Sequence, residues 1–301
     1  MKFRAHETFF IRKGWLYKGL KNVLDQPSVF TNKEKNPVDV LGIGSNMVKS
    51  LRYWLQATGL TEEKLVNNSK GRTKEQRLTK IGEIVFNNDK YFEESGSICL
   101  IHYFLASNYE LAPSWYYFFN EFEISEFNRE DFVIGIQKFS SMKGENPAKS
   151  SLEDDFNCLI NSYVLRKKLN PTRVNPESNI ECPLDELGLI EISDVSKGKD
   201  RIFKKSSLNN SCLNPYILYA IILDQYPEKN EIRISDLLTA PNNIGKIFNL
   251  NILSLSKALD VMEKMRFIDV IRTSGLDVIR IKKRRTFEEC IEAYYKSLNG
   301  K

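Results

Sequence analysis

The residues near the N-terminus include side chains that are well suited to proton transfer. His6 and Glu7 are adjacent, and Arg12 follows a few positions later. An imidazole can act as a general acid or base near neutral pH, so these three residues form a candidate catalytic cluster. A second interpretation is structural, because a histidine and a glutamate near a chain end can also tie that end to the core by hydrogen bonds.

A second candidate site is the acidic run Glu153, Asp154 and Asp155. Carboxylates bind hard cations such as Mg²⁺ or Mn²⁺, and a metal-activated water can cut a phosphodiester. The same acids fall in the first turn of a helix that is expected to begin after a Ser151 cap, where negative charge favours the helix dipole. The dipole suffices to explain the run, and a catalytic role for Asp154 and Asp155 stays open. We expect Mg²⁺ or Mn²⁺ if the protein is a nuclease and no cofactor otherwise.

Other catalytic motifs are not found in the sequence. It has no GxxxxGK[ST] loop and no convincing nuclease pattern of paired acids before a lysine. With two histidines and five widely spaced cysteines, a zinc site of the usual Cys/His kind is not expected. The odd cysteine count fits reduced, buried thiols. We interpret His102, inside the apolar segment 98–105, as a hydrogen-bonded core residue.

The segment 41–58, LGIGSNMVKSLRYWLQAT, predicts the turn and second helix of a helix-turn-helix. Gly42 and Gly44 allow a tight reversal, and Ser45 is expected to cap the helix that follows. Apolar residues at helical spacing predict a buried face; they are Met47, Leu51, Trp54 and Leu55. Polar groups on the other side can contact the bases and phosphates of DNA. These expected contacts are Ser45, Asn46, Lys49, Arg52, Tyr53 and Gln56. The alternative is an ordinary amphipathic helix with a solvated polar side.

Basic residues flank this helix on both sides. Before it, a helix beginning near Trp15 has a strongly basic entry. After it, the segment 61–86 predicts a two-stranded wing with its turn at 67–71, and such a hairpin would lie over the DNA backbone. The alternative for a charge run of this kind is a solvated loop. The expected DNA contacts in these two flanks are Lys13, Lys18, Arg72, Lys74 and Arg77.

The rest of the chain predicts a helical middle and a second helical unit with a hairpin. Residues 113–139 combine aromatic side chains with glutamates, which favours a packed core over stacking with bases. The polar segment 140–151 predicts a hinge. From Pro215 the pattern is three helices and then a hairpin with its reversal at 274–275. The expected DNA contacts at the end of this hairpin are Lys282, Lys283 and Arg284.

These patterns together predict a mainly α protein with small β-hairpins. We expect a winged helix-turn-helix domain at 1–110, a helical middle region with a basic loop at 111–210, and a winged-helix-like domain at 211–301. The 301 residues are 42% hydrophobic and 28% charged, with a formal net charge of +5, which is typical of a globular chain. No apolar run approaches the roughly 20 residues of a membrane helix, and the first residues lack a signal-peptide core. We therefore expect a cytoplasmic protein that does not contact a membrane.

Two N-terminal motifs, HETFFIRKGWLYKG (6–19) and LGIGSNMVKSLRYWLQATGL (41–60), together resemble the SspB-like family, long catalogued as a domain of unknown function. The segments PNNIGKIFNL (241–250) and GLDVIRI (275–281) fit the same family, so the resemblance covers nearly the whole chain. Two positions depart from the family pattern. Ala5 stands where glycine is expected, and Ser45 stands where lysine is common, which removes one phosphate contact.

The resemblance implies a role in a DNA phosphorothioation system of the restriction-modification and defence type, which replaces a backbone oxygen with sulfur. It implies double-stranded DNA as a ligand. It also implies a cysteine desulfurase, a sulfur-transfer protein and an ATPase as partners. The resemblance favours a nicking endonuclease, whereas the lack of a nuclease motif favours a non-catalytic DNA-recognition or adaptor subunit. A homodimer is a further expectation, because such readers often bind paired half-sites.

Overall fold

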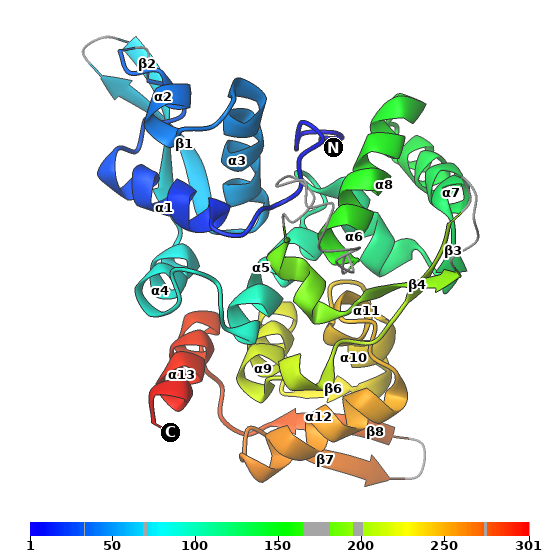
Figure 1. The fold of residues 1–301 in the computed structure, drawn as a ribbon. Helices are drawn as coiled ribbons and strands as arrows, with labels where there is room; N and C mark the ends of the chain where they lie inside the picture. Colours follow the sequence, from blue (N-terminus) through cyan, green and yellow to red (C-terminus); the bar gives the residue numbers. More distant parts are fainter. Residues whose placement is uncertain (33, 69–70, 165–180, 195–200, 274–275, 301) are drawn as a thin grey trace, which may run out of the picture.

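The computed structural model describes residues 1–32, 34–68, 71–164, 181–194, 201–273 and 276–300. Within these residues, helices dominate, and the strands form three small antiparallel sheets, ordered β1-β2, β3-β5-β4 and β6-β8-β7. The expected class, mainly α with small β-hairpins, is therefore confirmed. Figure 1 shows the N-terminal helices and the β1-β2 hairpin at one end of the molecule and the β6-β8-β7 sheet at the other. Among the described residues, no helix is both long and apolar enough to cross a membrane.

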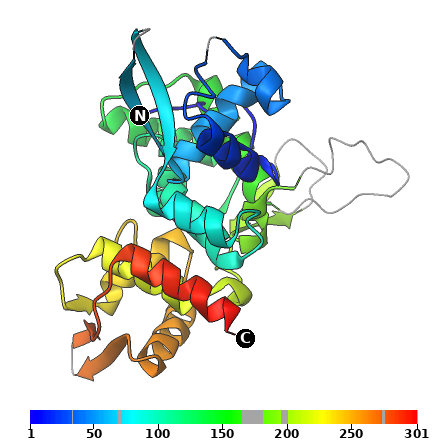
Figure 2. The ribbon, with the colours of Figure 1, turned by 90° about the vertical axis from the view of Figure 1, so that its left-hand side faces the viewer.

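The N-terminal unit contains the helices and the hairpin that the sequence predicts, in the predicted order. They are α1 (Trp15–Asp25), α2 (Pro37–Leu41), α3 (Ser45–Ala57), β1 (Thr61–Asn68) and β2 (Gly71–Leu78). Helices α1 and α3 approach closely at Gly19, where an added Cβ would lie 2.7 Å from a methyl carbon of Leu55. The hairpin projects from the helices at the top of the molecule (Figure 2). The predicted buried side chains Leu51, Trp54 and Leu55 are fully buried.

Two details of the predicted turn are wrong. Gly42 has a φ of 60°, the left-handed conformation that favours glycine, but Gly44 has a φ of −63°. Gly44 is the N-cap residue, and α3 begins at Ser45 without a side-chain cap. Ser45 therefore lies in the first turn of the helix and does not cap it.

The middle of the chain is a helical hairpin beside a small sheet. Its elements are α4 (Lys80–Asn88), α5 (Ser95–Ser107), α6 (Pro113–Tyr116), the π-helix η1 (Tyr117–Glu121), β3 (Glu126–Phe127), α7 (Arg129–Met142), α8 (Lys149–Tyr163), η4 (Pro183–Leu187), β4 (Ile190–Asp194) and β5 (Ile202–Lys205). Helices α7 and α8 pack together, and the predicted hinge at 140–151 is the turn between them with the adjoining helix ends. Helix α8 begins at Lys149 after Ala148, so the acidic run lies beyond its first turn and a Ser151 cap is wrong.

The C-terminal unit matches the predicted helices and hairpin and adds four elements. Its elements are η5 (Asn210–Cys212), α9 (Pro215–Gln225), β6 (Glu231–Arg233), α10 (Ile234–Thr239), α11 (Ile244–Ile247), α12 (Ile252–Lys264), β7 (Ile268–Thr273), β8 (Leu276–Ile281) and α13 (Phe287–Asn299). The four additions are η5, β6, α11 and α13. The predicted turn at 274–275 lies outside the described residues. Strand β6 joins the hairpin, and α13 packs on α9 and α4. A capping box of Thr286 and Glu289 starts α13.

The central helix α5 connects the three predicted units. Ten of its thirteen residues are buried, and it packs against α6, α9 and α11. His102 on α5 is bonded through Nδ1 to the Tyr163 hydroxyl (2.7 Å) and through Nε2 to the Ile247 carbonyl (2.8 Å). Burial lowers the pKa of His102 to about 4, so the ring is neutral. The core interpretation of His102 is confirmed, as is that of the five cysteines, all buried thiols. The boundaries at 110 and 210 stay predictions.

Candidate functional site

The N-terminal segment lies between α3 and α8 (Figure 1). His6 is buried there, with its ring stacked on Trp54 of α3 at 6.0 Å and edge-on to Trp115 of α6 at 5.8 Å. Three residues of the segment have a positive φ without being glycine: Arg4 (56°), Glu7 (50°) and Thr8 (67°). Such a backbone conformation persists only where surrounding contacts impose it.

Asp155 on α8 supplies those contacts. One of its oxygens accepts hydrogen bonds from His6 Nε2 and from the backbone N–H of Arg4, both at 2.8 Å. The other oxygen accepts the Ser114 hydroxyl. His6 Nδ1 in turn accepts the backbone N–H of Thr8 at 3.0 Å, which places the ring proton on Nε2. Both imidazole nitrogens and both carboxylate oxygens are therefore engaged.

The structure brings together only part of the predicted catalytic set. Asp154 pairs with Arg4 at 2.6 Å beside the His6–Asp155 contact. Glu7 points instead toward Lys49 of α3, with 3.8 Å between the charged atoms. Arg12 lies over the rings of Phe9 and Trp15.

The arrangement of His6 and Asp155 matches the structural interpretation, in which the chain end is tied to the core by hydrogen bonds. Within the described residues, no three His, Cys, Asp or Glu side chains gather as a metal site would need. Asp155 is saturated by donors, and Asp154 faces a guanidinium. As arranged, this pair does not fit the ligation of Mg²⁺ or Mn²⁺.

The exposed start of α3 is the second candidate site. Ser45, Asn46 and Lys49 are all exposed, and no side chain caps the first turn of the helix. Lys49 Nζ lies 3.4 Å from Asn46 Oδ1 on the same face. This end of α3 therefore combines uncapped backbone N–H groups, a hydroxyl, an amide and an ammonium, all of which can bind phosphate oxygens or base edges.

The second half of α3 differs from the predicted DNA face. Tyr53 is buried at 8% exposure, and burial raises the pKa of its hydroxyl. Arg52 forms an ion pair with Glu63 of β1, which is only 15% exposed. Gln56 donates to the Arg52 carbonyl at 3.0 Å. Tyr53 therefore belongs to the core, and Arg52 joins α3 to the hairpin. Helical spacing alone could not predict the burial of Tyr53 or the ion pair of Arg52, because it does not show which other segments pack on the helix.

Most of the predicted basic contacts in the flanks and the wing have acidic or carbonyl partners. Lys74 pairs with Glu63 at 3.0 Å, and Arg77 with Glu75 at 3.3 Å. Burial acts to raise the pKa of Glu63, but Arg52 and Lys74 outweigh it and lower the pKa overall. In the part of the chain that the structure describes, exposed Arg72 forms no ion pair.

Two flanking lysines of α1 are also engaged. Lys13 lies between Glu181 and Glu186, at 3.5 and 3.4 Å, far along the chain from the wing. Lys18 donates to the Leu41 carbonyl at the end of α2. Both side chains therefore stabilise the fold around α1.

The basic residues after β8 likewise include both partnered and exposed side chains. Lys282 pairs with Asp269 at 2.7 Å, while the side chain of Lys283 is exposed. Arg284 donates to three backbone carbonyls; they belong to Tyr226, Pro227 and Lys229. Arg284 thus holds the loop after α9 in place.

Comparison with protein families places the whole chain in one group. Residues 3–295 match the family model described as "Protein of unknown function (DUF4007)". The chain belongs to this family. It is similar to the "Magnesium ion-bound SspB crystal structure", with 25% identity and a TM-score of 0.82, over 100% of this chain and 89% of that one. It is also similar to the "SspB crystal structure", with 26% identity and a TM-score of 0.80, over 99% and 95% of the two chains. No curated protein matches the sequence. The resemblance to SspB-like proteins is therefore confirmed.

Proposed function

We propose that this protein is a DNA-binding component of a DNA phosphorothioation system. The similarity to SspB over the whole chain supports the association with such a system. The order of three helices followed by a hairpin is typical of a winged helix-turn-helix, in which the third helix enters the major groove. The cysteine desulfurase, the sulfur-transfer protein and the ATPase of the system are its partners in this proposal.

The observation that carries the proposal is the exposed polar start of α3. Ser45, Asn46 and Lys49 lie on one accessible end of the helix, and the adjacent hairpin has exposed Arg72. Phosphate contacts by such groups fix the register, and an exposed amide such as Asn46 can read adenine. The proposed DNA-binding surface is smaller than the sequence predicts, because Tyr53 is buried and Arg52 is paired with Glu63.

Binding should depend on Lys49 and Arg72. We expect Lys49→Ala with Arg72→Ala to weaken duplex binding about tenfold at moderate salt. The slope of log K against log salt should become shallower by about 0.9 for each phosphate that the variant no longer neutralises. Fluorescence anisotropy with a labelled duplex over a series of salt concentrations measures both quantities.

A matched control is Lys257→Ala with Lys264→Ala, which removes two exposed lysines from α12. This variant should keep the affinity and slope of the unaltered protein. An equal decrease in affinity in both double variants would point to non-specific attraction by net charge. Unchanged binding in the α3 and hairpin variant would overturn the assignment of this surface.

Strand nicking is the second candidate function, and the similarity to a magnesium-bound SspB structure favours it. A supercoiled plasmid is incubated with the protein and Mg²⁺ or Mn²⁺, with EDTA as the control. Open-circle product that disappears with EDTA supports a nickase. If Asp154→Ala, which removes an exposed ion pair, also abolishes that product, a catalytic role for Asp154 gains support. Intact plasmid despite tight binding supports the non-catalytic adaptor.

A further inference from the structure

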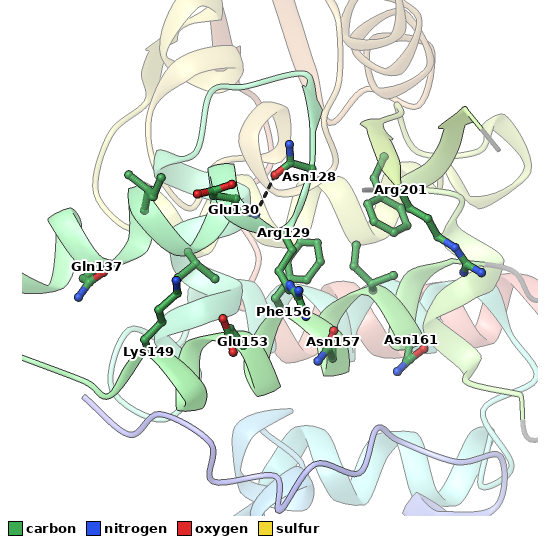
Figure 3. A pocket seen from close by; sticks show the side chains of 14 residues that line it. Asn128, Arg129, Glu130, Gln137, Lys149, Glu153, Phe156, Asn157, Asn161 and Arg201 are labelled. Atoms are coloured by element: carbon green, nitrogen blue, oxygen red, sulfur yellow. Dashed lines mark hydrogen bonds between the residues drawn. The ribbon is translucent and has the colours of Figure 1, made fainter. Parts of the chain in front are cut away.

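A groove runs between α7 and α8 on the side of the middle region. Its volume is about 590 Å³, and Figure 3 shows the side chains that line it. The floor is apolar and includes Val133, Phe156 and Phe203, all of them buried. At its edge, Ile134 is 61% exposed, which is unusual for an isoleucine on a packed helical hairpin. Among the apolar residues of the groove, Ile134 is therefore the one that the described residues leave most exposed.

Three cations line the groove along its length. In Figure 3, Lys149 lies at one end, Arg129 near the middle and Arg201 at the other end. In the part of the chain that the structure describes, none of the three forms an ion pair, unlike most cations around α1 and the wing. Unpaired cations at both ends of an apolar groove match a ligand with acidic groups at a defined spacing.

Carboxamide side chains also line the groove. Gln137 and Asn157 line the groove, and each has both a donor and an acceptor. Asn128 also lines it, but its Oδ1 already accepts the backbone N–H groups of Glu130 and Asp131. A peptide backbone presents the same two kinds of group, so carboxamides on helices can pair with an extended chain. From Lys149 to Asn161, α8 is about 18 Å long, which an extended peptide spans with five or six residues.

A nucleic-acid strand fits this groove less well. Glu130 and Glu153 also line it, and they would repel a continuous row of phosphates. The aromatic rings of Phe156 and Phe203 are 3% and 6% exposed, so they present no face on which a base could stack. A peptide can place acidic side chains at the cations and a neutral or basic one near Glu153.

We propose that the groove between α7 and α8 binds an extended segment of a partner protein, with an apolar side chain against Ile134 and acidic side chains five or six residues apart. This inference goes beyond DNA binding. The groove is built by α7, α8 and β5, whereas the proposed DNA contacts lie on α3 and the hairpin. The protein would then hold DNA with one surface and a partner chain with another.

The test is selection of a displayed library of random 12-residue peptides on the whole protein. We expect enriched peptides with two acidic positions five or six residues apart and an apolar residue between them. Arg129→Glu with Lys149→Glu should weaken the enriched peptides about tenfold or more in fluorescence anisotropy. These positions are the first residues of α7 and α8, where a glutamate favours the helix dipole, so the fold should be kept. Ile134→Asp should weaken the same peptides.

The matched control is Lys138→Glu with Lys264→Glu, two exposed lysines outside the groove lining. It should bind the peptides as the unaltered protein does. The proposal is overturned if no peptide is enriched, if enriched peptides lack the acidic spacing, or if the groove variants bind as tightly as the control. Tighter binding of a labelled 12-nucleotide single strand, abolished in the groove variant, would assign the groove to nucleic acid instead. DNA binding through Lys49 and Arg72 is measured separately, so either proposal can fail alone.

Discussion

Replacing Asp155 by alanine is expected to lower the free energy of unfolding by about 3–5 kcal/mol. The carboxylate is 2% exposed and accepts hydrogen bonds from His6, Ser114 and the backbone of Arg4. Alanine leaves these donors buried without an acceptor. It also removes the hydrogen-bond acceptor that holds the backbone of Arg4 in its positive-φ conformation. Urea unfolding at neutral pH, followed by circular dichroism, measures the change.

The neighbouring Asp154→Ala is the control for this prediction. Asp154 also pairs with Arg4, but its side chain is 32% exposed and that of Arg4 is 53% exposed. Exposed pairs contribute little, so the decrease in the free energy of unfolding should be below about 1 kcal/mol. Equal stability of both variants would contradict the view that Asp155 anchors the N-terminal segment. A nicking defect in the Asp154 variant alone would be a functional effect, free of any contribution from unfolding.

The sequence predicted the helices around the candidate site better than it predicted the surface. Leu51, Trp54 and Leu55 repeat at helical spacing, and that period alone places them in the core. The same period placed Tyr53 beside Asn46 and Lys49 on a polar face. In a pattern of polar and apolar residues a tyrosine counts as polar, but here the Tyr53 ring packs against His6 of the N-terminal segment. No local pattern contains that contact.

The number of unpaired basic side chains was overestimated for a related reason. Sequence spacing shows Arg52 and Lys74 as free cations, but both pair with Glu63. The pairing of β1 with β2 brings Glu63 beside Lys74, and the packing of β1 on α3 brings it beside Arg52. His6 and Asp155 are similarly far apart in sequence, and their contact follows from the packing of α8 on the N-terminal segment. Residues that act through long-range contacts are therefore the ones that sequence reading assigned least well. Ser45 and Asn46, at the exposed start of one helix, depended only on local structure, whereas Lys49 on the same face also lies near Glu7 of the N-terminal segment.

The N-terminal and C-terminal units differ in the helix that precedes the hairpin. Helix α3 exposes Ser45, Asn46 and Lys49 at its start, whereas α12 exposes Ile252 and Leu253 at 57% and 70%. Apolar side chains at that position give no hydrogen bonds to base edges or phosphates. This difference concentrates the proposed DNA contact in the N-terminal unit.

Lys205 of β5 places an ionisable amine in the interior of the middle region. Its side chain is largely buried, and its ammonium donates to the carbonyl of Phe118 in the π-helix and to that of Phe122 just after it. Nζ also lies 4.5 Å from the centre of the Phe118 ring. Burial and the nearby charge of Lys246 lower the pKa of Lys205 to about 7, while Glu123 acts in the opposite direction.

This shift predicts stability that rises with pH. In the unfolded chain the lysine has its ordinary pKa of about 10.4, so between about pH 7 and pH 10 the unfolded chain binds a proton that the folded chain does not. The free energy of unfolding should therefore gain about 2 kcal/mol from this group between pH 7 and pH 9. Lys205→Met keeps a flexible apolar stem against the rings and should remove that rise, whereas Lys204→Met, at the exposed neighbouring position, should keep it. Urea unfolding of the three proteins at several pH values measures the difference, and parallel curves for all three would show that Lys205 stays charged in the folded protein.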